Sequence, residues 1–258
     1  MATYNKRGYK APKPEEEADE TVTAQYINDK DSETAEVFDT LDTTASKMGT
    51  WFTRNQKFIF GGILVLAVAT VGYLGYNHFI MEPKEEEAAN EMFQAQQYFD
   101  QAVNGQDTDS LYNLALNGAE GKMGFLKIAE NYSGTKAASI SSYYAGMAYL
   151  NTGKFKEAIG QLEKFQSEDL MLKATSLGAI GDAFSELNQP NEALEYYLKA
   201  ANHNKNDFTT PRFSYKAGLV ALQLGKKEEA FKLLTLVKEE YKSSPEAANV
   251  DYYLGMSL

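Results

Sequence analysis

The chain has 258 residues, a formal net charge of −11 at neutral pH and no cysteine. The acidic balance argues against binding to nucleic acid, because contacts with phosphates need a basic face. The absence of cysteine excludes disulfides, thiolate catalysis and metal sites built from cysteine.

The N-terminal part of the sequence divides into two segments. Residues 1–33 are polar, charged and interrupted by proline, which predicts a disordered cytoplasmic tail. Over residues 34–57, apolar residues recur every three or four positions, the spacing that places side chains on one face of a helix. This stripe consists of Val37, Leu41, Ala45, Met48 and Phe52. We expect a juxtamembrane amphipathic helix that lies on the bilayer or on a partner, or that simply extends the segment following it.

The most apolar segment runs from Phe58 to Met81 and contains no Asp, Glu, Lys or Arg. A helix of these 24 residues is about 36 Å long, enough to cross a hydrocarbon core of about 30 Å. The segment is too long and too far from the N-terminus for a cleaved signal peptide, and it is apolar on every side, unlike a core helix. We therefore predict a single transmembrane helix over residues 58–81.

Charges on the two sides of this segment predict its orientation. Lys47, Arg54 and Lys57 precede it, whereas Lys84 follows it within an acidic run. Because cations favour the cytoplasmic side of a membrane, the N-terminus is predicted to be cytoplasmic. Residues 85–258 are then expected on the opposite side.

Three stretches of residues 85–258 repeat one another. In each, a glycine is followed twelve residues later by an alanine, a turn signal lies between them, and apolar residues recur at helical spacing. Successive glycines are 35 and 37 residues apart. The pairs, expected to be repeat-packing residues, are Gly146 with Ala158, Gly181 with Ala193, and Gly218 with Ala230. Since small residues let antiparallel helices approach closely, each unit is predicted to be a helix, a turn and a helix.

This pattern resembles the tetratricopeptide repeat. The predicted fold class is therefore all-α, with a single transmembrane helix followed by a tetratricopeptide-repeat solenoid. Upstream, residues 90–105 and 124–138 are expected to be the two helices of a degenerate first unit. Downstream, the segment ending at Leu258 is expected to be a lone helix that caps the last complete pair.

Resemblance to this repeat implies a concave groove, lined by the first helix of each unit, that binds protein segments. Two of the three predicted groove faces are apolar and aromatic, which suits an amphipathic helix or a hydrophobic peptide. The alternative is that the terminal helix or the first unit covers some of these side chains. Counted from the repeat glycines, the groove residues are Ile140, Tyr143, Met147, Leu150, Asp182, Arg212, Tyr215, Leu219 and Leu222, with Thr175, Gly178 and Ser185 at the remaining positions of the middle unit.

No catalytic motif occurs in the sequence. His78 and His203 are isolated, and there is no phosphate-binding glycine loop or Ser-His-Asp set. The glutamate runs at residues 15–17 and 85–87 are interpreted as solvated charge. The prediction is a protein that is not an enzyme and that needs no metal, cofactor or small-molecule substrate.

The order of arm, span and repeats, together with the stretch FLKIAENYSGTKAASISSYYAGMAYLNTGKFKEAIGQLEKF, resembles the bacterial inner-membrane tetratricopeptide family called YfgM. The resemblance extends over residues 34–258. It implies an ancillary subunit of the SecYEG translocon in the bacterial inner membrane, with the C-terminal domain in the periplasm. There it would recruit a membrane-tethered chaperone of the PpiD type to assist secreted proteins at the channel exit. The alternative is a scaffold for another envelope machine, in cell-wall synthesis, division or outer-membrane secretion.

Overall fold

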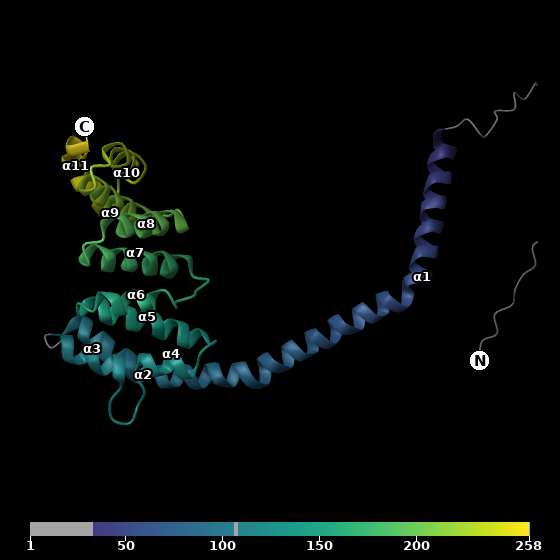
Figure 1. Cartoon of the computed structure of the whole chain (residues 1–258), viewed down its shortest axis with the longest axis horizontal. Helices are drawn as coiled ribbons and strands as arrows, with labels where there is room; N and C mark the ends of the chain where they lie inside the picture. The colour runs from purple at the N-terminus through teal and green to yellow at the C-terminus, as the bar shows by residue number, and fades with distance from the viewer. Residues whose placement is uncertain (1–32, 106–107, 258) are drawn as a thin grey trace, which may run out of the picture. The chain divides into compact units, whose positions relative to one another are not determined.

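The computed structural model describes residues 33–105 and 108–257, and every regular element in these ranges is helical (Figure 1). The all-α prediction is thus confirmed, while the predicted tail lies almost entirely outside the described residues. The chain divides into two units, residues 1–68 and 69–258. The elements are α1 (Glu33–Tyr76), the π-helical turn η1 (Asn77–Met81), α2 (Glu82–Asn104), α3 (Thr108–Asn117), α4 (Phe125–Asn131), α5 (Lys136–Asn151), α6 (Phe155–Leu162), α7 (Leu170–Glu186), α8 (Pro190–His203), α9 (Thr209–Gln223), α10 (Lys227–Glu240), the 3₁₀ turn η2 (Pro245–Asn249) and α11 (Val250–Ser257).

Helix α1 contains both the predicted juxtamembrane stripe and most of the predicted span, without a break between them. Its most apolar 18-residue window has a mean hydropathy of 2.1, and none of that window is buried within the protein. Large side chains such as Phe58 and Val71 are 82% and 70% exposed. Exposure of this much apolar surface is unfavourable in water. The helix is therefore a candidate membrane span.

The helix does not end where the apolar run ends. Through η1 the backbone forms a wider turn, in which the N–H of Glu82 donates to the carbonyl of Asn77 five residues earlier. Pro83 explains this turn, because proline has no N–H and its ring collides with the carbonyl four residues before it in a regular helix. The chain then continues directly into α2, so the predicted domain start at residue 85 falls inside a helix.

Helices α5 to α10 form three successive hairpins, pairing α5 with α6, α7 with α8, and α9 with α10 (Figure 1). The turns use equivalent residues at the spacing of the repeat, since Gly153, Asn188 and Gly225 have φ angles of 72°, 56° and 71°. Glycine and asparagine adopt this left-handed conformation at the least cost. Helix α11 packs against α10 and α9, as predicted for a terminal cap.

The repeat glycines make room for a large side chain of the second helix. A Cβ atom on Gly146 would lie 2.5 Å from Leu162, one on Gly181 2.7 Å from Tyr197, and one on Gly218 2.9 Å from Leu234. Each of these partners follows the repeat alanine by four residues, one helical turn later. All three predicted glycine–alanine pairs are buried. The side chain that approaches each glycine most closely is not the alanine itself but the residue one helical turn after it.

The first unit differs from its prediction, because α2 packs mainly against α3 and α4 mainly against α5 rather than α2 against α4. The end of the second predicted helix differs as well. Helix α4 ends at Asn131 rather than continuing to Ala138, because Gly134 turns the chain with a φ of 92°. Thr135 then starts a new helix, since its Oγ1 accepts a hydrogen bond of 3.0 Å from the N–H of Ala138. Residues 124–138, which were predicted to form one helix, therefore belong partly to α4 and partly to α5.

Candidate functional site

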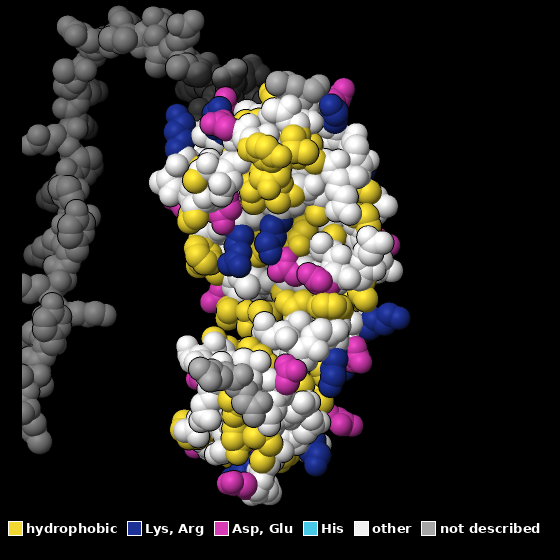
Figure 2. Space-filling view, turned by 90° about the vertical axis from the view of Figure 1, so that its left-hand side faces the viewer, with side chains coloured by type: hydrophobic (Ala, Val, Ile, Leu, Met, Phe, Trp, Pro, Cys, Tyr) yellow, Lys and Arg dark blue, Asp and Glu magenta, His cyan; other side chains and the backbone are white. Residues whose placement is uncertain are grey.

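The nine predicted groove residues all lie on α5, α7 and α9, the first helices of the three hairpins. Arg212 is exposed and the other eight are partly buried. Helix α7 lies next to both α5 and α9, so the three helices form one continuous surface. Figure 2 shows one face of the molecule, where apolar side chains form separate patches with lysine and acidic side chains between them.

At the N-terminal end of the groove, Tyr143 packs its ring 5.1 Å from the ring of Phe165. Burial raises the pKa of Tyr143, the neighbouring Tyr144 raises it further, and Arg212 acts in the opposite direction. Arg212 belongs to the third hairpin and Tyr143 to the first.

In the middle of the groove, Asp182 of α7 connects three helices. It accepts a hydrogen bond of 2.6 Å from the hydroxyl of Tyr197 on α8 and one of 2.5 Å from Nζ of Lys216 on α9. Burial and then the Asp182 carboxylate raise the pKa of Tyr197. Since both side chains of the Asp182–Lys216 pair are about one-third exposed, solvent screens the pair and its contribution to stability is small.

At the C-terminal end of the groove, the terminal helix covers part of the predicted surface, which is the alternative that the sequence left open. Tyr215 and Leu222 pack against the terminal cluster, with the Tyr215 ring 5.8 Å from that of Tyr253 on α11. Gly178 is not an open groove position, because it is buried where its Cβ would overlap the ring of Phe213. Leu219 is partly buried and belongs to none of the four apolar clusters of the described residues.

The interpretation of residues 85–87 as solvated charge was wrong for Glu85. Its carboxylate accepts hydrogen bonds of 2.6 and 2.7 Å from the N–H groups of Lys136 and Ala137, the first residues of α5. The neighbouring Lys84 donates to the carbonyl of Ser133 at 2.9 Å. A carboxylate at a helix N-terminus satisfies free N–H groups and interacts favourably with the helix dipole. No local signal reveals this role, because the partners are 51 and 52 residues away in the sequence.

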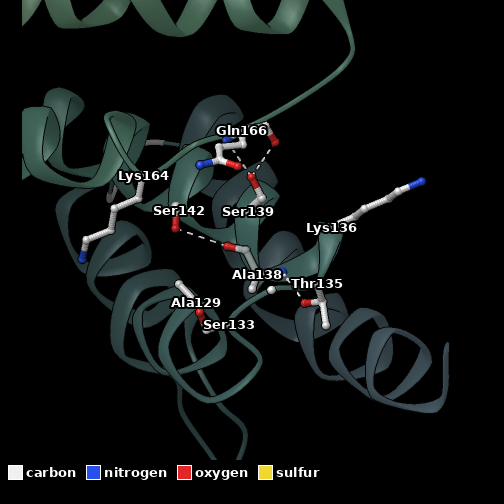
Figure 3. Close-up of a pocket in the computed structure, with 10 residues that line it drawn as sticks. Ala129, Ser133, Thr135, Lys136, Ala138, Ser139, Ser142, Lys164 and Gln166 are labelled. Carbon is white, nitrogen blue, oxygen red and sulfur yellow. Dashed lines mark hydrogen bonds between the residues drawn. The ribbon is translucent and has the colours of Figure 1, made fainter. Parts of the chain in front are cut away.

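A separate polar pocket lies where the α4–α5 turn meets the segment after α6 (Figure 3). Ser139 donates to the carbonyl of Gln166 at 2.6 Å and accepts from its N–H at 2.8 Å, which fixes that segment to α5. Lys136 extends away from the other lining residues, as Figure 3 shows. Within residues 33–105 and 108–257 no cluster of three or more His, Asp or Glu side chains has the geometry to hold a metal ion.

Models of the family described as tetratricopeptide repeat match residues 141–169, 174–207 and 214–244. These three units are tetratricopeptide repeats. The matched ranges correspond to the hairpins α5–α6, α7–α8 and α9–α10, the same units that the glycine–alanine spacing predicted. A search of curated proteins finds no match to the chain. Because tetratricopeptide repeats mediate binding between proteins, the solenoid is a protein-interaction scaffold.

Proposed function

We propose that this protein is a non-catalytic, membrane-anchored scaffold whose tetratricopeptide groove binds a protein partner. The observation that supports this most directly is the unbroken connection between the candidate span and the solenoid. From Ala69 through η1 to the end of α2 the backbone is helical, so no flexible linker separates the apolar segment from the first packed helix. Such a protein presents its groove close to the membrane surface.

The scaffold is proposed to lie in the bacterial inner membrane, surrounded by lipid along residues 58–81. The cations before the span support a cytoplasmic N-terminus, and the solenoid would then be periplasmic. An absence of cysteine is compatible with that compartment.

The proposed partners are the SecYEG channel and a membrane-tethered chaperone of the PpiD type. The support for this part is the resemblance of residues 34–258 to the YfgM family, since the repeat geometry alone suits any tethered scaffold. In this arrangement α1 contacts the channel and the groove holds the chaperone near the channel exit. Tethering two proteins to one membrane complex raises their effective concentration to about the millimolar range, so a weak groove contact is sufficient.

Affinity purification of the tagged full chain in mild detergent tests the proposal. We expect channel subunits and the chaperone to copurify. Leu219→Asp places a charge on the groove face of α9 and is expected to release the chaperone, whereas Leu236→Asp, the same change at a position of α10 that is also partly buried, should retain it. Tyr215 is a poor choice for this test because it also packs against α11.

Each outcome has a distinct meaning. Recovery of division, cell-wall or outer-membrane secretion proteins in place of the channel would contradict the Sec assignment and leave the scaffold role intact. Retention of the partner by Leu219→Asp would place the contact on another surface. Loss of the partner from both variants would indicate that either charge disturbs the fold, and circular dichroism of the two purified variants would then show it.

A further inference from the structure

The first helices of the solenoid run parallel to α2, the helix that continues from the candidate span. At one end, Glu85 on α2 contacts the first N–H groups of α5. Fourteen residues further along α2, the ring of Phe99 lies 5.0 Å from that of Tyr144 on α5. Contacts that follow the same order along both chains show that the two helices point in the same direction. The N-termini of α2 and α5 therefore lie side by side.

The same relation continues along the stack. Ser139, in the first turn of α5, is bonded to Gln166 just before α7 begins. In the next repeat, α8 pairs with both α7 and α9 and is joined to each by a short connection, so α9 begins at the same end of the stack as α7. The loops that precede α5 and α7, with the segment before α9, thus form one border of the solenoid, which we term the entry edge (residues 132–135, 163–169 and 204–208). In Figure 1 the loops before α5 and α7 lie on the side from which the chain enters α2.

The end of the apolar run lies at this edge. A Cβ on Gly134 would be 3.7 Å from Cε of Met81, the last residue of the predicted span. Lys84 is bonded to the neighbouring carbonyl of Ser133. If Met81 marks the membrane boundary, the α4–α5 turn is at the level of the lipid headgroups. The rest of the entry edge lies at a similar level, because the first helices are parallel.

Exposed apolar side chains gather next to this edge. Leu170, Met171 and Leu172 form the first turn of α7 and are 50%, 46% and 37% exposed, and Phe208, just before α9, is 58% exposed. The side chains of three consecutive helical residues point in different directions around the helix axis, so they do not all pack against one buried face. Met171 and Phe208 are 37 residues apart, one repeat length, and thus occupy equivalent places in successive units.

Charges around these side chains are of both signs. Lys164, Lys173 and Lys205 lie nearby along the chain, as do Glu168 and Asp207. Asp169 is already engaged, because its carboxylate accepts from the N–H groups of Met171 and Leu172. Apolar side chains among charges of mixed sign suit the boundary between lipid headgroups and acyl chains without demanding an anionic lipid.

We propose that the entry edge rests on the outer surface of the phospholipid bilayer, with Leu170, Met171, Leu172 and Phe208 inserted at the headgroup level. The proposal rests on the membrane anchoring proposed above. Because the start of α2 and the entry edge lie at the same distance from the membrane, the proposed transmembrane helix holds these side chains against the lipid. The stack of repeats then lies along the membrane, and the groove opens parallel to its surface.

The absence of cysteine permits a direct test with single labels on the full chain. The chain is reconstituted in nanodiscs of phosphatidylethanolamine and phosphatidylglycerol that contain a spin-labelled phosphatidylcholine as quencher. A fluorophore is attached at Met171→Cys, Phe208→Cys, Gln189→Cys or Val71→Cys. Gln189 lies in the turn after α7, whose last residue, Glu186, is about 22 Å from Met171 at 1.5 Å per residue, and Gln189 is also exposed.

We expect quenching at positions 171 and 208 to be at least threefold stronger than at 189, and quenching at 71 to be strongest. Equal quenching at 171, 208 and 189, with strong quenching at 71, would overturn the edge proposal and leave the anchor intact. Weak quenching at 71 would overturn the anchor and the edge together.

A second measurement excludes insertion driven by the fluorophore itself. The label is placed at Glu168→Cys, next to the apolar turn, in the otherwise unchanged chain and in a chain that also has Leu170→Ser, Met171→Ser and Phe208→Ser. The proposal predicts that the three serines remove most of the quenching at position 168. Unchanged quenching in that chain would show that these side chains do not hold the edge on the lipid.

Discussion

Replacement of Gly178 by alanine tests the packing between successive repeats. The added Cβ would overlap the ring of Phe213, which is only 3% exposed and has little room to move. Overpacking of this kind costs about 1–3 kcal/mol. The same substitution also gains about 0.5–1 kcal/mol, because alanine is the better helix former. The net result is a predicted loss of stability of up to about 2.5 kcal/mol.

A matched glycine separates the two contributions. Gly160 lies in α6 with nothing within 4 Å of the position of its Cβ, so Gly160→Ala is expected to stabilise the protein by about 0.5–1 kcal/mol. The difference between the two variants cancels the gain in helix propensity and leaves the overpacking cost of about 1–3 kcal/mol. Guanidinium unfolding of the full chain in detergent micelles, followed by circular dichroism, measures both. Equal unfolding midpoints for the two variants would refute the contact between α7 and α9.

Two further predictions concern contacts between helices. Glu85→Ala removes the acceptor for the first N–H groups of α5 and should lower the free energy of unfolding by about 1–2 kcal/mol, whereas Glu86→Ala, at an exposed neighbour, should change it by less than about 0.5 kcal/mol. Equal losses of stability in the two variants would argue against the hydrogen bonds between Glu85 and the N-terminus of α5. Burial and Asp182 raise the pKa of Tyr197 above its ordinary value of about 10, so the folded state binds this proton more tightly than the unfolded chain. Stability should therefore fall as pH rises above about 10, and Tyr197→Phe should reduce that slope by up to about 1.4 kcal/mol per pH unit in unfolding curves recorded between pH 9 and 12. An unchanged slope would indicate that Tyr197 is not buried against the carboxylate.

The three hairpins were predictable because their signals are local. Each turn contains a glycine or asparagine that adopts a left-handed conformation, and each first helix contains a glycine where the second helix approaches. These requirements act within about 35 residues and recur with the repeat, so the sequence shows them directly. The candidate span was also predictable, because its length and composition are local features of the sequence.

The features that the sequence did not reveal depend on residues far apart in the chain. Glu85 looked like one charge in an acidic run, and only folding brings it to the start of α5. Gly178 was placed in the groove by counting, whereas the approach of Phe213 from the next repeat closes that position. Tyr215 has the right register for the groove but lies under α11, the alternative that register alone left open. Register therefore predicts which face a residue occupies, and tertiary packing decides whether it stays accessible.

The account depends above all on a solenoid held outside the cytoplasm by one membrane helix. Labelling of single cysteines in intact bacterial spheroplasts with a membrane-impermeant maleimide tests this directly, with Gln189→Cys in the α7–α8 turn and Ala45→Cys in α1 before the span. We predict that position 189 reacts in intact spheroplasts and that position 45 reacts only after the membrane is permeabilised. Reaction at position 45 with protection at position 189 would contradict the account.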